Sequence, residues 1–430
     1  MSIKSNWKKC KLKDLVKINS SSVSKKDNLE HIVYLDTGNI TMGKIEELAE
    51  FAYSEAPSRA KRKVKENSIV YSMVRPNQRH YGLIKNPTTN LIVSTGFAVL
   101  DAKEFADSKY IYYWLTQNHI TDLLQSIAEN STSAYPAIRP IDLENLDISL
   151  PPLDEQKRIA EILGSLDDKI ELLQKQNKTL EDMAKALFKS WFVDFDVVRA
   201  KQKGLPKADI MREYHLTDEL YDLFPSSFAD SPLGPIPSGW EVKPLGAICQ
   251  LALGGTPSRT NLKYWEKGSI PWINSGKVND FRIITPSEYI TEAGYNSSAT
   301  KLLPIHTTVV AITGATLGQV SFTEIECCAN QSVVGILENE KLASEYIYLF
   351  ILFNLDKLLA KQTGGAQQHI NKNDIASLMC LVPSEKILEQ YKQKQKPLFD
   401  KIHNNMVQIQ TLTELRDTLL PRLISGKIRV

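Results

Sequence analysis

The sequence predicts an α+β protein in which two similar α+β domains are separated by two long antiparallel helices. Three observations predict this fold class. A heptad pattern of apolar residues runs through 153–192, a weaker pattern closes the chain, and the sequence repeats with a period of about 230 residues. Because a globular stretch precedes each helix, antiparallel pairing as an intramolecular coiled coil gives a pseudo-twofold arrangement. We expect a first domain at 1–152, a spacer helix at 153–192, an extended linker at 193–238, a second domain at 239–383 and a second spacer helix at 384–430.

The composition is that of a globular protein with several cores. The chain has 430 residues, of which 42% are apolar and 24% are charged. It has neither an apolar run of the roughly 18 residues that a membrane helix needs nor an N-terminal signal peptide, so we expect a cytoplasmic protein. The five cysteines form no C-x-x-C pair, which favours buried free thiols over metal ligation. A net charge of +2 permits nucleic-acid binding without arguing for it.

The first domain recurs in the second half of the chain. Trp7 and Leu12 return as Trp240 and Leu245 with the same spacing. Further matches follow in the same order: 34–39 with 272–277, 94–100 with 331–337, and 166–170 with 398–402. Four ordered matches indicate two diverged copies of one unit, each followed by a long helix.

Both copies carry signals for strands and helices. The runs 68–74 and 307–312 are rich in β-branched residues and predict strands. The stretches 109–124 and 344–360 are amphipathic and predict helices that lie on these strands. Together they favour mixed α+β domains.

The long helices are predicted from their apolar seams. The first seam is Ile159, Leu163, Leu166, Ile170, Leu173, Asn177, Leu180, Ala184, Leu187 and Trp191, and the second is Tyr391, Leu398, Ile402, Ile409, Leu412, Leu419 and Leu423. The first helix would span roughly 58 Å and hold two similar surfaces a fixed distance apart. Asn177 and Asn405 would weaken the pair yet fix its register. The alternative is that identical helices of two chains dimerise the protein.

Three details of the helices and the linker are also predicted. Pro397 should begin or kink the second helix. The outer face of the first helix, with Glu155, Gln156, Arg158 and Lys169, is expected to remain open for docking. The glycines and prolines of 193–239 predict an extended linker. Its residues Tyr214, Glu219, Tyr221 and Phe224 either pin this linker to the protein or form a docking strip.

Local motifs carry a family resemblance over essentially the whole chain. They are Pro151–Ile159, Ile236–Trp240 with Leu245, Gly254–Ser258, Cys328–Ser332 and Gly364–Gln368. With these motifs the chain resembles the specificity (S) subunits of type I restriction-modification systems. The resemblance implies that each domain reads one half of a bipartite double-stranded DNA target. It also implies that the helices bind methyltransferase (M) subunits and, through them, restriction (R) subunits. The adenine-DNA methyltransferase and ATP-dependent endonuclease activities would belong to that complex.

The motifs of common enzymes are absent from the sequence. The run 314–318 is glycine-rich but lacks the Lys-Ser/Thr of a Walker A motif, and there is no H-E-x-x-H or Asn-Pro-Pro-aromatic stretch. We therefore expect a non-catalytic protein without a cofactor or a metal. A scaffold whose two domains bind proteins instead of DNA stays open as the alternative. No residues support a hydrolase.

The first domain supplies candidate DNA contacts in three segments. Arginine reads guanine and asparagine or glutamine reads adenine through paired hydrogen bonds, while lysine and arginine bind phosphates. For base reading we expect the loop with Arg75, Asn77, Gln78, Arg79 and Tyr81. For phosphate contact we expect Arg59, Lys61, Arg62 and Lys63, unless this charge run is simply a solvated loop. Tyr135 and Arg139 either close over the same groove or form a structural turn.

The second domain offers a different set of candidates. Thr256, Ser258, Arg259 and Asn261 follow a Gly-Gly turn at which the backbone can approach a phosphate. Thr313 and Thr316 occupy the place of the Arg75 loop. Gln367, Gln368, His369 and Lys372 form a polar cluster that either contacts bases or is an ordinary turn. Because the loop chemistry differs between the domains, the two half-sites should differ in sequence.

Overall fold

The computed structural model describes residues 7–131, 135–362 and 368–430. The chain divides into two compact units, Met1–Glu171 with Thr411–Val430, and Leu172–Gln410. Each unit contains one globular domain together with part of each long helix. We refer to the residues before the first long helix as the first domain and to 240–383 as the second domain.

The first domain contains two four-stranded sheets, with strand orders β2-β11-β8-β9 and β6-β3-β10-β7. Helices α2 and α3 pack on the sheet that contains β8 and β11, where Ile69, Tyr71, Tyr110 and Leu124 share one core. The bounds are β1 Lys8–Lys11, α1 Leu12–Leu15, β2 Val16–Ile18, β3 His31–Leu35, β4 Ile40–Thr41, β5 Lys44–Ile45, β6 Ala49–Ala52, β7 Ala60–Lys63, β8 Ile69–Ser72, β9 Tyr81–Leu83, β10 Leu91–Ser94, β11 Phe97–Ala102, α2 Ser108–Leu115, α3 Asn118–Glu129, α4 Pro140–Glu144 and β12 Asp147–Leu150.

The second domain repeats this plan. Its sheets have the orders β16-β23-β20-β21 and β18-β17-β22-β19. The bounds are β15 Glu241–Pro244, β16 Leu251–Leu253, β17 Ile270–Ile273, β18 Glu288–Ile290, α9 Glu292–Asn296, β19 Leu302–Leu303, β20 Thr308–Ala311, β21 Val320–Phe322, β22 Cys327–Ala329, β23 Val333–Ile336, α10 Ser344–Phe353, α11 Leu355–Leu359, α12 Lys372–Ala376 and β24 Met379–Val382.

Equivalent hydrogen bonds confirm that the domains are copies. Strand β3 runs parallel to β10, as β17 runs parallel to β22, whereas the other pairings within these four sheets are antiparallel. The Ile138 amide donates to the Met73 carbonyl at 2.8 Å in the first domain, and the Ile370 amide donates to the Ile312 carbonyl at 3.0 Å in the second. The predicted α+β fold class with two similar domains and two long helices is therefore confirmed.

The predicted domain helices are each interrupted. The stretch 109–124 is divided between α2 and α3, because the backbone of Gln117 is extended. The stretch 344–360 is divided between α10 and α11 at Asn354. Helices α2 and α10 begin with the related sequences SKYIYYWL and SEYIYLFI. This match is a repeat signal that the sequence comparison missed.

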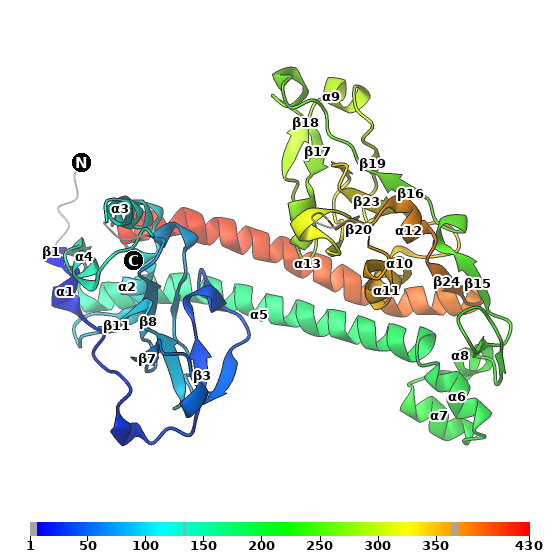
Figure 1. Cartoon of the computed structure of the whole chain (residues 1–430), viewed down its shortest axis with the longest axis horizontal. Coiled ribbons are helices and arrows are strands. Elements are labelled where there is room, and N and C mark those ends of the chain that lie inside the picture. Colours follow the sequence, from blue (N-terminus) through cyan, green and yellow to red (C-terminus); the bar gives the residue numbers. More distant parts are fainter. Residues whose placement is uncertain (1–6, 132–134, 363–367) are drawn as a thin grey trace. The chain divides into compact units, whose positions relative to one another are not determined.

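The two long helices are α5, Leu153–Phe192, and α13, Glu385–Ile424, and they lie antiparallel within each unit (Figure 1). In the unit 172–410, the Asn405 side chain donates to that of Asn177 at 2.8 Å, and Gln395 donates to the Ala184 carbonyl at 3.1 Å. Both asparagines are buried. The bond satisfies the Asn405 nitrogen and the Asn177 oxygen, whereas the Asn177 nitrogen has no hydrogen-bond partner among the described residues. Any other register loses this bond.

Pro397 does not start the second helix, contrary to our expectation. It lies inside α13, twelve residues after Glu385, on an exposed face. Proline removes one helical hydrogen bond and costs roughly 3 kcal/mol in a helix interior. Tyr391, Phe399 and Ile402 are buried on either side of it, and this burial offsets the cost.

The expected docking face of α5 is wrong for two of its four residues. Glu155 and Gln156 are only 7% and 1% exposed. The Glu155 carboxylate accepts hydrogen bonds from the Trp7 indole at 3.0 Å and from Arg429 at 2.9 Å, within one unit. Gln156 bonds the Asp107 amide and the Pro151 carbonyl. These two residues therefore join the chain ends and α2 to the start of α5, whereas Arg158 and Lys169 are exposed.

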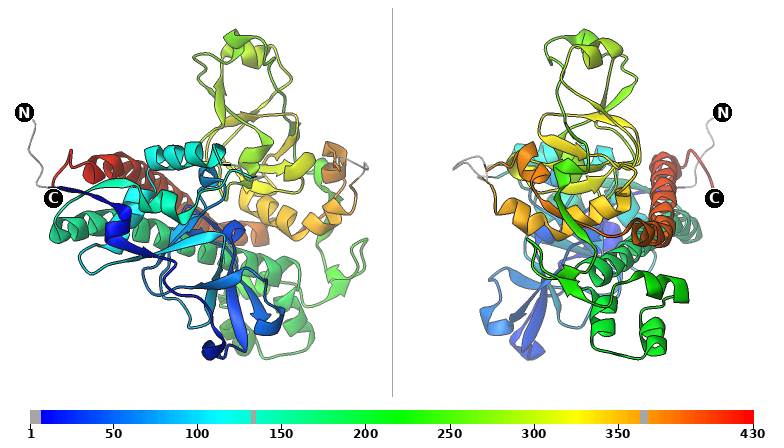
Figure 2. Two further views of the ribbon diagram at one scale, coloured as in Figure 1. Left: turned by 60° about the vertical axis from the view of Figure 1, so that its left-hand side comes forward. Right: turned by 90° about the vertical axis from the view of Figure 1, so that its right-hand side faces the viewer.

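The linker is not extended but forms short helices, which cluster near the end of α5 (Figures 1 and 2). These are α6 Asp196–Gln202, α7 Lys207–Glu213 and α8 Asp218–Leu223, followed by the paired strands β13 Phe228–Ala229 and β14 Ile236–Pro237. Glycines and prolines limited the length of each helix but left room for one or two turns. Phe224 is buried with its ring 5.0 Å from that of Trp191, so it pins the linker to α5.

In each unit, a tyrosine of the domain and an arginine share one carboxylate of α5; the arginine belongs to α13 in the first unit and to the second domain in the second unit. In the first unit, the Tyr113 hydroxyl donates to Asp167 at 2.6 Å and Arg416 donates at 2.8 Å. In the second unit, the Tyr348 hydroxyl donates to Glu181 at 2.7 Å and Arg282 donates at 3.2 Å. Arg282 is fully buried, whereas the Arg416 side chain is 23% exposed. The two anchors share their chemistry but differ in depth.

The cysteines are free thiols. Cys249, Cys327, Cys328 and Cys380 are buried and Cys10 is half-buried. Burial raises the pKa of each buried thiol, which keeps it protonated and unreactive. Among the described residues, no helix has both the length and the apolar character needed to span a membrane.

Candidate nucleic-acid interface

The Arg75 loop is a rigid, exposed turn at the end of β8. Both Arg75 and Arg79 have left-handed backbones, with φ of 47° and 56°. Such a conformation costs energy for residues other than glycine and is frequent at functional sites. The Arg75 amide donates to the Pro136 carbonyl at 2.9 Å, and the Arg79 amide donates to that of Pro76 at 3.0 Å. These bonds fix the loop before any ligand arrives.

Three of the predicted side chains on this loop face solvent. Arg75, Asn77 and Gln78 are exposed. The Arg75 guanidinium lies 5.3 Å from the centre of the Tyr135 ring, which is 62% exposed. Residues 132–134 lie outside the described residues, but Tyr135 confirms that the loop after α3 meets the Arg75 loop. Arg79 is half-buried and donates to Asn118 at 2.8 Å, which ties the loop to the start of α3.

One predicted contact of the first domain is wrong, and a second has a partner within the protein. Tyr81 is only 3% exposed, because it lies in β9 and its ring stacks on Tyr71 with centroids 5.6 Å apart. Alternate side chains of a strand point to opposite faces of the sheet, and Tyr81 points into the core. It therefore supports the loop and is not available to bases. Arg139 caps α4 and forms an ion pair with Asp142 at 3.2 Å. The Arg139 side chain is nevertheless 77% exposed, so its DNA contact stays a prediction.

The basic run 59–63 is not a loop but mostly strand β7, so some of its basic side chains are exposed and others are half-buried. Arg59 and Lys61 are exposed. Lys63 is half-buried and lies 2.6 Å from Asp27, which lowers the pKa of that carboxyl to about 2 through the lysine hydrogen bond and the bonds from Ser24. Arg62 is half-buried beside Ser22. Of the four predicted phosphate contacts in this run, Arg59 and Lys61 are thus the two exposed cations.

The second domain places a neutral loop where the first has Arg75. Thr313 forms a backbone bridge with His369, as Val74 does with Ala137 in the first domain. Thr316 lies in the same turn, Gly314–Thr316, and its hydroxyl donates to the Thr313 carbonyl at 3.3 Å. Gln368, His369 and Lys372 are exposed beside this turn or at the start of α12. Gln367 lies outside the described residues.

The Gly-Gly turn serves the fold, not a phosphate. A Cβ on Gly254 would lie 2.1 Å from the Asn330 carbonyl oxygen, and one on Gly255 would lie 2.6 Å from the Thr300 amide. The protein's own backbone therefore fills the space that we assigned to a ligand. Thr256 donates to Gln331 at 2.5 Å, and Asn261 caps the turn Leu262–Tyr264, so both have structural partners. Ser258 is exposed and bonds Thr260.

Arg259 is held by groups that the sequence analysis did not single out. Its guanidinium makes two hydrogen bonds to Glu288, at 2.7 and 2.9 Å. It also lies 3.6 Å from the Trp265 ring and 4.8 Å from the Trp272 ring. About half of the side chain stays exposed. An arginine that stacks on aromatic rings and makes two hydrogen bonds has little rotational freedom. The Arg259 guanidinium therefore presents one edge to solvent in a fixed orientation.

Comparison with known proteins gives a consistent result. The family model described as "Type I restriction modification DNA specificity domain" matches residues 4–182 and 237–413. The type I restriction enzyme HindI specificity subunit of Haemophilus influenzae is 29% identical, over 99% of this chain and 100% of that protein. The MjaIX specificity subunit of Methanocaldococcus jannaschii is 29% identical, over 82% of this chain and 75% of that protein.

A solved structure shares the fold. The S subunit of a type I restriction-modification system from M. genitalium has a TM-score of 0.56 and 15% identity, and the alignment covers 98% of this chain and 97% of that one. At this identity the likeness concerns the arrangement of helices and strands alone.

Proposed function

Because this chain belongs to the family of type I restriction-modification DNA specificity domains, we propose that it is the subunit that reads a bipartite, asymmetric double-stranded DNA target. The first domain reads one half-site and the second domain reads the other. In this proposal the two DNA-reading domains are residues 1–152 and 239–383, and the two spacer helices are residues 153–192 and 384–430. The chain itself is non-catalytic and needs no cofactor.

One observation carries the proposal. The same backbone hydrogen bonds, to the carbonyls of Met73 and Ile312, hold a cationic aromatic loop in one domain and a neutral hydroxyl loop in the other. A fixed scaffold with variable loops suits a protein that reads different sequences with similar parts. Arg75, Asn77 and Gln78 supply paired hydrogen bonds to base edges in the first half-site. Thr313, Thr316, Gln368 and His369 line the second.

The remaining contacts position the duplex. Arg59, Lys61 and Lys372 are exposed cations that suit phosphates. Arg259 can contact either a base or a phosphate when its ion pair with Glu288 opens. Methyltransferase subunits dock on the spacer helices and restriction subunits join through them, in the cytoplasm. The adenine methylation and the ATP-dependent cleavage are then activities of the assembled complex.

Genome-wide mapping of adenine methylation in strains with and without this gene tests the proposal. We expect one bipartite motif with unequal halves to lose methylation when the gene is deleted. A restored gene carrying Arg75→Ala should recover the second half of the motif and relax the first. If no bipartite motif disappears, the DNA-reading function is refuted and a protein-binding scaffold takes its place.

A further inference from the structure

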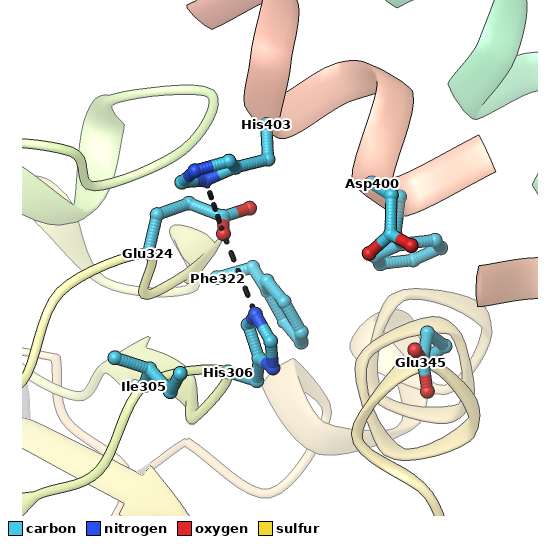
Figure 3. Close-up of a pocket in the computed structure, with 8 residues that line it drawn as sticks. Ile305, His306, Phe322, Glu324, Glu345, Asp400 and His403 are labelled. Carbon is cyan, nitrogen blue, oxygen red and sulfur yellow. Dashed lines mark hydrogen bonds and ion pairs between the residues drawn. The ribbon is translucent and has the colours of Figure 1, made fainter. Parts of the chain in front are cut away.

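A pocket of about 150 Å³ opens in the unit 172–410, beside α13. It is lined by Ile305, His306, Phe322, Glu324, Glu345, Phe399, Asp400 and His403 (Figure 3). At its mouth, Ile305 is 52% exposed and the Asp400 side chain is 51% exposed. Glu345 and Glu324 are only 7% and 9% exposed and form its inner wall. A side chain that enters from solvent would therefore meet carboxylates at depth.

Two of the three carboxylates have basic partners of their own. Glu324 accepts a hydrogen bond from His403 at 2.9 Å and lies 3.7 Å from His306. Asp400 forms an ion pair with Lys396 at 2.8 Å. Among the described residues, the Glu345 carboxylate accepts a hydrogen bond from the Ser344 hydroxyl, at 3.4 Å, and has no basic group within ion-pair distance. The ammonium of Lys396, which pairs with Asp400, attracts Glu345 only from farther away. A carboxylate that is more than nine-tenths buried without a cation is costly, so this position is suited to receive one.

Two aromatic residues that line the pocket, Phe322 and Phe399, already lie beside a cation of this chain. The guanidinium of Arg282 lies 5.6 Å from the centre of the Phe322 ring and 5.2 Å from that of Phe399, beside Glu181. The same two rings line the pocket next to Glu345, where the imidazole of His306 already stacks on Phe322 with ring centroids 5.6 Å apart. Within the described residues, no group of three or more His, Cys, Asp or Glu is arranged to hold a metal ion. A planar cation that stacks on aromatic rings fits these walls better than a metal ion does.

We propose that this pocket receives the guanidinium of an arginine side chain from a partner protein, with Glu345 as its counter-ion. The partner is a subunit of the same complex, and in this respect the inference rests on the proposed function. Asp400 and His403 belong to α13, one of the helices assigned to partner docking, so the pocket continues that surface. The inserted arginine gives Glu345 the ion pair that this chain does not supply.

Calorimetric titration of the full chain with N-acetyl-arginine methylamide tests the site without any partner. We expect saturable binding, and no binding of the citrulline analogue, which has the same shape without the charge. Glu345→Gln should weaken binding at least tenfold, whereas Glu385→Gln, at an exposed position of α13, should not change it. Equal binding of citrulline, or unchanged binding by Glu345→Gln, overturns the proposal.

A second variant protects the test against a folding defect. Ile305→Trp fills the exposed mouth without touching the carboxylates, and it should also abolish binding while leaving the thermal unfolding midpoint unchanged. If the probe still binds to this variant, the pocket is not its site. Addition of the methyltransferase subunit should expel the bound probe, and retention of the probe in the assembled complex refutes the arginine as occupant. Failure of the wild-type chain to assemble at all refutes the proposed function instead.

Discussion

The first and second domains repeat one backbone and differ in two places. At the reading loops, Arg75 and Tyr135 of the first domain face solvent where the second has Thr313 and His369. At α5, Asp167 pairs with Arg416 of α13, and these side chains are 28% and 23% exposed, whereas Glu181 pairs with Arg282 of the second domain, which is fully buried. Loops can change without loss of fold because few buried groups depend on them. The anchors cannot change freely, since each must keep its charges paired.

The buried anchor gives the largest expected effect. Arg282 is surrounded by four aromatic rings, and its Nε and Nη2 atoms find no hydrogen-bond partner in the structure. Burial alone would raise the pKa of Glu181, but Arg282, Tyr348 and Lys185 together lower it. Arg282→Met leaves this carboxylate buried without its main cation. We expect a loss of about 3–5 kcal/mol in the stability of the second unit, measured by amide hydrogen exchange in α10.

Two variants control this prediction. Arg416→Met removes the arginine of α13 that pairs with Asp167 in the first unit. Because Asp167 is 28% exposed, we expect the free energy of opening measured by amide exchange in α2 to fall by about 1 kcal/mol or less. Adding Glu181→Gln to Arg282→Met removes the uncompensated charge and should recover part of the loss. Equal costs at the two arginines would show that burial does not distinguish the anchors.

The reading loops give the next largest effect. Arg75→Ala removes a side chain that can make paired hydrogen bonds to guanine, and should reduce discrimination at one half-site by about 1–3 kcal/mol. Competition binding with DNA altered in one half-site at a time measures this. Thr313→Ala should affect the other half-site only. If Arg75→Ala relaxed both halves equally, the assignment of one domain to each half-site would be wrong.

The Arg259–Glu288 pair gives a smaller effect. Glu288→Gln weakens the pair and frees the guanidinium for a phosphate. Because an exposed ion pair contributes up to about 1 kcal/mol, we expect a rise in DNA affinity of no more than roughly fivefold. Glu292→Gln, another exposed carboxylate nearby in sequence, controls for the general loss of negative charge. A fall in affinity would mean that Glu288 itself accepts a hydrogen bond from a base.

Features that depend on neighbours in sequence were predictable. The heptad seam located α5 at Leu153–Phe192. Asn177 and Asn405 were expected to fix the register of the two helices, and the structure adds that their side chains hydrogen-bond to each other. Such patterns are visible because the helix period sets which side chains share a face. The internal repeat likewise gave two domains of one topology.

Features that depend on distant partners were not predictable. Lys61 and Lys63 look alike in the sequence, yet Asp27 meets only Lys63. Tyr81 follows a polar loop but is turned inward by the strand that begins with it. Glu288 holds Arg259 across 29 residues without any local signal. Tertiary packing decides which of several similar side chains remains exposed and without an ion-pair partner. The predicted DNA contacts were therefore the part of the site that the sequence predicted least well.

The basic strand β7 gives the smallest expected effect on DNA binding. Lys61 is exposed, so Lys61→Met should reduce the slope of log affinity against log salt by about one unit, evenly across DNA sequences. Lys63→Met should change the slope less, because Asp27 already neutralises that ammonium. Equal changes in slope would show that the ion pair opens when DNA binds.

The acid stability of the first domain separates the same two lysines independently of DNA. The pKa of Asp27 is lowered to about 2, chiefly by its hydrogen bond with Lys63. A lowered carboxyl pKa stabilises the folded state at pH values above the ordinary aspartate pKa of about 3.9, and this contribution is lost as the pH falls toward 2. The thermal midpoint of wild type should therefore fall more steeply between pH 4 and pH 2 than that of Lys63→Met. Lys61→Met should keep the wild-type profile, because its ammonium takes no part in the Asp27 pair.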